Sequence, residues 1–125
     1  MKIAISSSGL TLDSQVDPRF GRAEHFIIVE TESMEFEVLD NENANSAGGS
    51  GISTAKMIVD AGVKAVLTGN CGPNAQRTLS AADVKLYTGV SGIVSEVVES
   101  FKKGELKESS SANVSPHFGM GKTNG

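Results

Sequence analysis

Apolar positions near the start of the chain form short runs that are typical of β-strands. Residues 2–6 read as a buried strand, residues 26–30 form a second apolar run, and residues 34–39 alternate between apolar and polar side chains. Because successive side chains of a strand point to opposite faces, the alternation predicts a strand, and the polar residues 31–33 predict a hairpin. The first part of the chain is therefore predicted to be rich in strands.

After this region the pattern changes to helices and strands in alternation. Ile52, Ala55, Ile58 and Val59 recur at helical spacing before Gly62, which predicts a helix that ends there. The elements predicted next are strand 65–68, helix 74–82, strand 84–87 and helix 93–101. Such alternation implies parallel strands joined by crossover helices.

These elements predict an α/β fold. Its form is a single domain with a mixed five-stranded sheet flanked by helices, and the element order resembles the ribonuclease H-like architecture. The 125 residues suit one domain, which we assign to residues 1–101. Residues 102–125 are poor in apolar side chains and rich in Ser, Gly and Lys, so we expect a flexible tail that buries too little surface to offset its ordering entropy.

Charge and composition exclude several classes of partner. The chain carries 15 acidic and 11 basic residues, a net charge of -4, without the basic stripe that binding to nucleic acid requires. No stretch approaches the roughly 20 apolar residues that span a bilayer. Because the first residues are too short an apolar run for a signal peptide and a lone cysteine cannot form an internal disulfide, we expect a cytoplasmic protein.

The single cysteine, Cys71, is the first candidate ligand. It lies between predicted strand 65–68 and the predicted helix start near Asn74, where open α/β sheets bind ligands. A thiolate suits iron-sulfur, copper or molybdenum-sulfur species. One cysteine is too few for an ordinary four-ligand site, so the sequence points to a cluster that brings its own sulfides. The alternative is that Cys71 is merely a small loop residue.

The two histidines, His25 and His117, are the candidate nitrogen ligands. His25 stands at the beginning of the second predicted strand, and His117 lies in the predicted tail. For each, the alternative is a surface residue without a role in binding.

The first long loop contains candidate contacts for an anion. Arg19 and Arg22 flank Phe20 and Gly21, so two guanidinium groups occur where glycine permits close backbone approach. The structural alternative, compatible with the first, is that Phe20 anchors the loop in the core and Asp17 pairs with an arginine.

Backbone amides at predicted helix starts supply further anion contacts. Gly49 and Gly51 precede the first predicted helix, and Gly72 and Asn74 lie at the start of the second. Free amides at a helix start favour negative charge. The glycine-rich segment lacks the Gly-Lys-Ser/Thr ending of a P-loop, and carboxylates do not converge on the central strands as two-metal hydrolysis requires. These patterns favour binding over catalysis.

Two loop motifs resemble a known family. The segments Asp17-Pro18-Arg19-Phe20-Gly21-Arg22-Ala23 and Gly69-Asn70-Cys71-Gly72-Pro73-Asn74-Ala75, with Phe26 and the pair Tyr87 and Gly89, are similar to the dinitrogenase iron-molybdenum cofactor biosynthesis family. The similarity extends over about residues 1–101. It implies a small domain without known catalysis that binds or carries a metal-sulfur cofactor of the iron-sulfur or molybdenum-iron-sulfur type, or its precursor.

The resemblance also implies partners, and this chain departs from the family's pattern at one position. Expected partners are proteins that make or accept the metallocluster. Members that bind the nitrogenase cofactor often have a histidine where this chain has Arg19, so His25 or His117 would have to replace it as a ligand. We therefore expect a carrier with Cys71, His25 and His117 as metal ligands. The alternatives are a small-anion or nucleotide-binding enzyme and a protein-interaction module.

Overall fold

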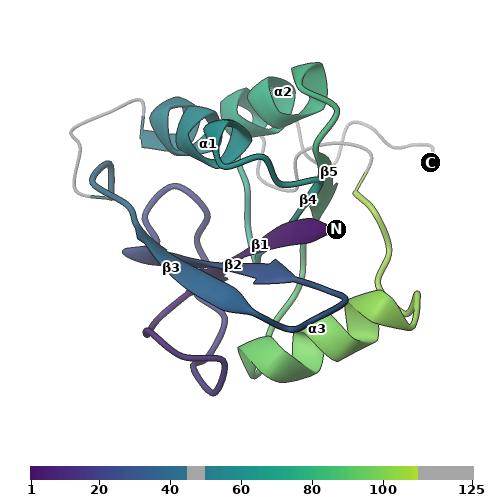
Figure 1. Cartoon of the computed structure of the whole chain (residues 1–125). Helices are drawn as coiled ribbons and strands as arrows, with labels where there is room; N and C mark the ends of the chain where they lie inside the picture. The colour runs from purple at the N-terminus through teal and green to yellow at the C-terminus, as the bar shows by residue number, and fades with distance from the viewer. Residues whose placement is uncertain (45–49, 110–125) are drawn as a thin grey trace.

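A computed structural model describes residues 1–44 and 50–109 of the chain. Figure 1 shows its helices and strands in chain order. The elements are β1 (Lys2–Ser7), β2 (His25–Glu30), β3 (Phe36–Asp40), α1 (Ser50–Asp60), β4 (Ala65–Leu67), α2 (Pro73–Ala81), β5 (Lys85–Tyr87) and α3 (Val94–Lys102).

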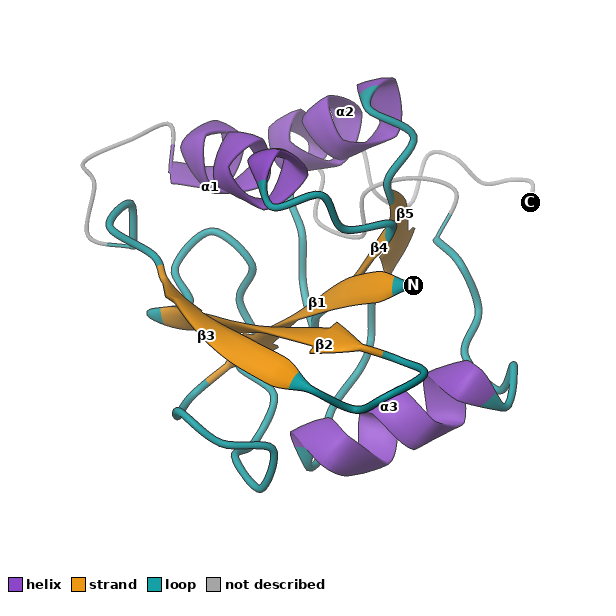
Figure 2. Cartoon of the chain, viewed as in Figure 1, coloured by secondary structure: helices purple, strands orange, loops and turns teal. Residues whose placement is uncertain are grey.

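All five strands form one mixed sheet in the order β3-β2-β1-β4-β5. β1, β4 and β5 run parallel, whereas β2 is antiparallel to both β1 and β3. Helices α1 and α2 lie over one face of the sheet and α3 lies over the other (Figure 2). The predicted α/β class, a single domain with a five-stranded mixed sheet flanked by helices, is confirmed.

The core lies on both faces of the sheet, which explains why the central strands read as continuous apolar runs. Alternate side chains of β1 and β2 enter opposite layers. The layer beneath α1 and α2 includes Ala4, Phe26, Ile28, Ala55, Ile58, Val66 and Leu79. The layer above α3 includes Ile3, Ile5, Ile27, Val29, Leu67, Val94 and Val98.

One difference from the predicted element boundaries is at β3. The sequence pattern starts this strand at residue 34, but it starts at Phe36. Met34 instead adopts a left-handed conformation with a φ of 62°, and its backbone amide donates to the Glu30 carbonyl (2.7 Å). Because bulky residues rarely adopt positive φ, the sequence pattern gave no reason to expect a turn at Met34.

The chain after α3 returns to the edge strand β5. The backbone amide of Ser109 donates to the Leu86 carbonyl (2.7 Å), and its hydroxyl lies 2.6 Å from that of Thr88. Residues 110–125, including His117, lie outside the described residues. The division into a domain at 1–101 and a flexible tail at 102–125 therefore remains a prediction.

Gly69 provides a test of the packing that joins the two long loops. A Cβ atom at this position would lie 2.6 Å from the carbonyl oxygen and 2.7 Å from the Cα atom of Pro18. Since both are backbone atoms, we expect Gly69→Ala to lower the free energy of unfolding by about 1–3 kcal/mol. Denaturant unfolding measures this loss.

The control is Gly72→Ala, because a Cβ there meets nothing within 4 Å and the backbone φ is -77°. We expect this variant to remain within about 1 kcal/mol of the wild type. Equal stability of the two variants would contradict the described approach of the loops.

Candidate binding site

The site is built where the loops after β1 and β4 meet. The carbonyl of Pro18 accepts a hydrogen bond from the backbone amide of Asn70 (2.7 Å), and the amide of Phe20 donates to the Asn70 carbonyl (3.0 Å). Arg19 and Asn70 thus form a short parallel bridge. Because β1 and β4 are parallel neighbours, both loops leave the same edge of the sheet, where open α/β sheets bind ligands.

Buried hydroxyl groups fix the first loop over the sheet edge. The hydroxyl of Ser6 donates to the Asp17 carbonyl (2.7 Å), and the Asp17 amide donates to the Ser6 carbonyl (2.8 Å). The Thr68 hydroxyl lies 2.7 Å from that of Ser6 and donates to it, since the Ser6 proton is already used. All three residues are buried, so this network holds the loop on β1 and β4 in one position.

A pocket of about 220 Å³ lies between the first loop and the starts of α1 and α2. Its lining residues are Phe20, Gly21, Arg22, Ser50, Gly51, Gly72, Pro73, Asn74 and Ala75. Gly21 approaches α1 closely, because a Cβ on it would lie 3.1 Å from the Gly51 Cα. The structure therefore brings together Phe20, Gly21, Arg22, Gly51, Gly72 and Asn74, all of which the sequence placed in one site.

The first loop is anchored as the structural alternative anticipated. Phe20 is 2% exposed and its ring packs edge-on against Phe26, with ring centroids 5.3 Å apart. The Asp17 carboxylate accepts hydrogen bonds from the Arg19 backbone amide (2.9 Å) and from its Nε (3.3 Å). The hydrogen bond from the Arg19 side chain to the Asp17 carboxylate and the negative charge of that carboxylate raise the pKa of Arg19. Arg22 lines the pocket and Arg19 does not, so the predicted anion contact of Arg19 remains a prediction.

Arg22 is held at the pocket wall by a partner that the sequence did not reveal. Its Nη1 donates to the Ala44 carbonyl (3.0 Å), which orients the guanidinium group. Nearby, the Asn41 side-chain amide donates to the carbonyls of Ala23 (2.8 Å) and Gly21 (3.3 Å). Asn41 is 6% exposed, and its carbonyl oxygen accepts from the Thr54 hydroxyl (3.3 Å), which ties the loop to α1.

Cys71 lies beside the pocket but faces the core. It is 2% exposed, belongs to the apolar layer beneath α1 and α2, and its Sγ lies 3.7 Å from the Gly72 carbonyl. Burial raises the pKa of the thiol to about 12. The thiol is therefore directed into the core and is protonated at neutral pH.

His25 lies on the other face of the sheet from Cys71. In β2, Phe26 and Ile28 enter the layer that contains Cys71, so His25 shares the opposite face with Ile27 and Val29. Its Nδ1 lies 2.9 Å from the Asp40 carboxylate. Cys71 and His25 are consequently not assembled as ligands of one metal ion.

Two predicted site residues, Gly49 and His117, lie outside the described residues. Within residues 1–44 and 50–109, His, Cys, Asp and Glu side chains do not gather in any group of three or more that could hold a metal ion. The metal-ligand roles given to Cys71, His25 and His117 therefore remain predictions.

Sequence reasoning missed Ser50, Pro73 and Ala75 in the pocket wall and Asn41 behind it. Ser50 and Pro73 could have been found, because each is the first residue of its helix and proline is common at that position. The role of Asn41 depends on contacts between distant segments, for which the sequence gives no local signal.

The burial of Cys71 predicts low chemical reactivity. With a pKa of about 12, only about 10⁻⁴ of the thiol is ionised at pH 8, against about one tenth for a thiol at the ordinary value of 9.0. We expect iodoacetamide to label the native protein at pH 8 at least a hundredfold more slowly than the protein unfolded in guanidinium. Rapid labelling of the native protein, followed by mass spectrometry, would show that the thiol is accessible.

Comparisons with known proteins agree with the fold. The family model described as dinitrogenase iron-molybdenum cofactor matches residues 1–104. An uncharacterized protein of Methanocaldococcus jannaschii is 30% identical over 112 residues, which are 86% of this chain and 95% of that protein.

Solved structures resemble this chain over most of their own length. The apo form of the orange protein from Desulfovibrio gigas has a TM-score of 0.87 at 35% identity, covering 90% of this chain and 96% of that one. A NifB-like protein from Thermotoga has a TM-score of 0.74 at 42% identity, covering 86% and 91%.

Among the described residues, no helix has the length and the apolar character that crossing a membrane would require. The family model spans both loops of the pocket and all eight elements of the sheet and its helices. The chain belongs to the dinitrogenase iron-molybdenum cofactor family.

Proposed function

We propose that the protein binds and carries an anionic metal-sulfur cofactor, or its precursor, in the pocket between the first loop and the starts of α1 and α2. The observation that carries the proposal is the convergence of these three segments around one space. Membership of the cofactor family supports the class of cargo, which is of the iron-sulfur or molybdenum-iron-sulfur type.

The electrostatics of the two helix starts favour an anion. The start of an α-helix carries partial positive charge and unsatisfied backbone amides. Neither α1 nor α2 has an acidic residue in its first turn, and Gly72, the N-cap of α2, offers no side chain to cap it. Arg22 adds a full positive charge at the pocket wall. Sulfide ligands of a metal cluster carry negative charge. In this pocket they would face backbone N–H groups at two helix starts and the Arg22 guanidinium group.

This donor set fits a cluster held by hydrogen bonds and charge rather than by protein-metal bonds. Recruiting Cys71 would require the thiol to leave the core and to lose a proton whose pKa is raised to about 12. His25 is on the opposite face of the sheet. A cargo bound without covalent ligation can be released without breaking a metal-thiolate bond, which suits a carrier. The proteins that supply and accept the cluster are the partners that this role requires.

Pocket size favours a compact ion over a nucleotide. Sites for drug-sized ligands enclose about 300–1,000 Å³, and this pocket encloses about 220 Å³. Among the described residues, the lining contains no carboxylate, histidine or exposed thiol that could act as a general base or nucleophile. Binding is therefore better supported than an enzyme that uses the same pocket.

Substitution of Gly72 tests whether the charge at the α2 start holds the cargo. Gly72 has an extended backbone (φ -77°, ψ 171°) and open space around its missing Cβ, so Asp and Asn both fit as N-caps. We expect Gly72→Asp to weaken the binding of tetrathiomolybdate at least tenfold relative to Gly72→Asn, because the two side chains differ mainly in charge. Absorption spectroscopy at equilibrium measures the affinity.

Stability provides the control for this pair. Either N-cap should leave the free energy of unfolding unchanged or raise it by a few tenths of a kcal/mol, about the gain expected over glycine. Weaker binding by the Asp variant alone, at full stability, would support an electrostatic site. Equal affinity of the two variants would refute it.

A further inference from the structure

The edge strand β3 leaves a row of backbone groups open. β3 pairs only with β2 in the described sheet. Glu35 and Asn41 bond toward β2, since the Glu35 carbonyl accepts from the Glu30 amide (2.9 Å) and the Asn41 amide donates to Glu24 (2.9 Å). By alternation, the amides and carbonyls of Phe36, Val38 and Asp40 point away from the sheet. Such an edge can accept another strand.

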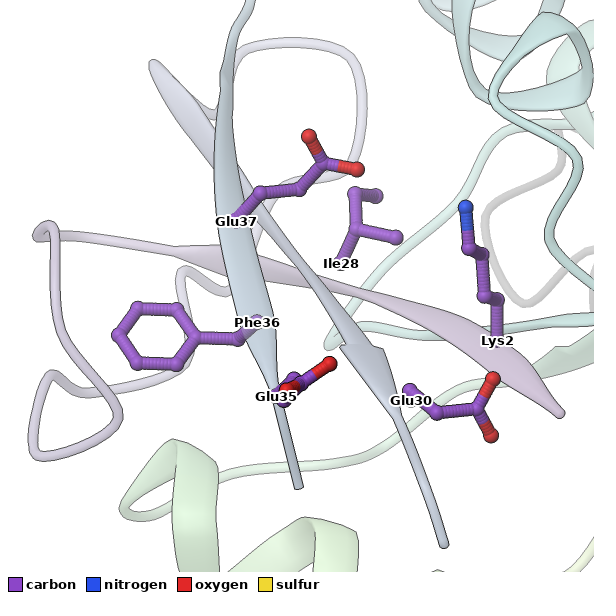
Figure 3. A pocket seen from close by; sticks show the side chains of 6 residues that line it. All are labelled: Lys2, Ile28, Glu30, Glu35, Phe36 and Glu37. Atoms are coloured by element: carbon purple, nitrogen blue, oxygen red, sulfur yellow. The ribbon is translucent and has the colours of Figure 1, made fainter. Parts of the chain in front are cut away.

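The two faces of β3 beside this edge have different chemistry. Phe36 is 42% exposed and lies on the face above α3, next to the half-buried Val38. Glu35 and Glu37 project to the other face, on the side of Ile28 (Figure 3). An added strand would therefore meet apolar side chains on one face and carboxylates on the other.

The acidic face contains a hollow suited to a long basic side chain. This hollow encloses about 200 Å³ and is lined by Lys2, Ile28, Glu30, Glu35, Phe36 and Glu37. Ile28, at 3% exposure, provides an apolar surface, and Figure 3 shows carboxylates around it. Lysine and arginine combine an apolar stem with a cationic head, which matches an apolar floor with an acidic rim.

The charges in the hollow are not balanced within it. The Glu30 carboxylate accepts a hydrogen bond from the Met1 amine (2.5 Å). For Glu35 and Glu37, the described residues offer no ion pair, and both side chains are exposed. Lys2 is the single basic side chain in the lining, against three carboxylates.

We propose that the open edge of β3 is a docking site for an extended basic segment of a partner protein, added to the sheet as a further strand. Its lysine or arginine side chains occupy alternate positions and lie against Glu35 and Glu37. Its intervening side chains are apolar and pack on Phe36 and Val38. A second copy of this chain fits less well, because it would bring its own Glu35 and Glu37 to the same face.

Two short peptides of equal length test the proposal on the full chain, one alternating lysine with valine and the other glutamate with valine. We expect the lysine peptide to shift the amide NMR signals of Phe36, Val38 and Asp40. Its affinity should be at least tenfold higher than that of the glutamate peptide and should fall as salt is added.

A charge-reversed variant separates this docking from general attraction to an acidic protein. Glu35→Lys combined with Glu37→Lys changes two exposed side chains and should reverse the preference, so that the glutamate peptide binds more tightly. Equal affinities, shifts centred elsewhere, unchanged preference in the variant, or no binding would overturn the proposal. Shifts of the β3 amides on simple dilution would assign the edge to a second copy instead. The outcome is independent of tetrathiomolybdate binding, which involves the other end of β1.

Discussion

The close backbone approach of Pro18 to Gly69 and Asn70 is the contact on which the rest of the site depends. Two backbone hydrogen bonds join the loops, and the absence of a side chain at Gly69 permits the short distance. The first loop then rests on the ends of β1 and β4 through Ser6, Asp17 and Thr68. Only with this loop in place do Gly21 and Arg22 face the starts of α1 and α2 across the pocket.

The two ends of β1 differ in electrostatic character, although the chain as a whole has a net charge of -4. At the carboxyl ends of the parallel strands, two helix starts without acidic residues and the Arg22 guanidinium create a local preference for anions. At the opposite end of β1, Lys2 lies beside three glutamates and the start of β3. The proposed carrier would have to hold its cargo and to meet other proteins, and the two proposed surfaces lie at opposite ends of β1.

Much of the fold could be predicted from the sequence because periodicity reports burial. β1 and β2 read as apolar runs since both of their faces are covered, and the alternating strands and helices after α1 required parallel pairing. Parallel pairing then placed the loops that follow β1 and β4 at one edge of the sheet. For this reason the sequence pattern alone groups Phe20, Gly21, Arg22, Gly72 and Asn74.

What the sequence could not supply was the direction of individual side chains. The position of Cys71 in a ligand-binding loop indicates where its backbone lies, but whether Sγ faces the pocket or the core depends on packing against α1 and α2. Alternation shows that His25 and Phe26 point to opposite faces, yet it does not say which face carries the site. Asn41 and Ala44 support the pocket from a distant part of the chain, and no local pattern marks them.

An NMR titration of the full chain with tetrathiomolybdate tests the central claim most directly, because it reports on both loops at once. The account predicts that the backbone amide signals of Phe20, Gly21 and Arg22 shift together with those of Gly51, Asn74 and Ala75, at a single affinity, while the amide of His25 stays unchanged. Shifts confined to one loop, or centred on the His25 face of the sheet, would contradict it.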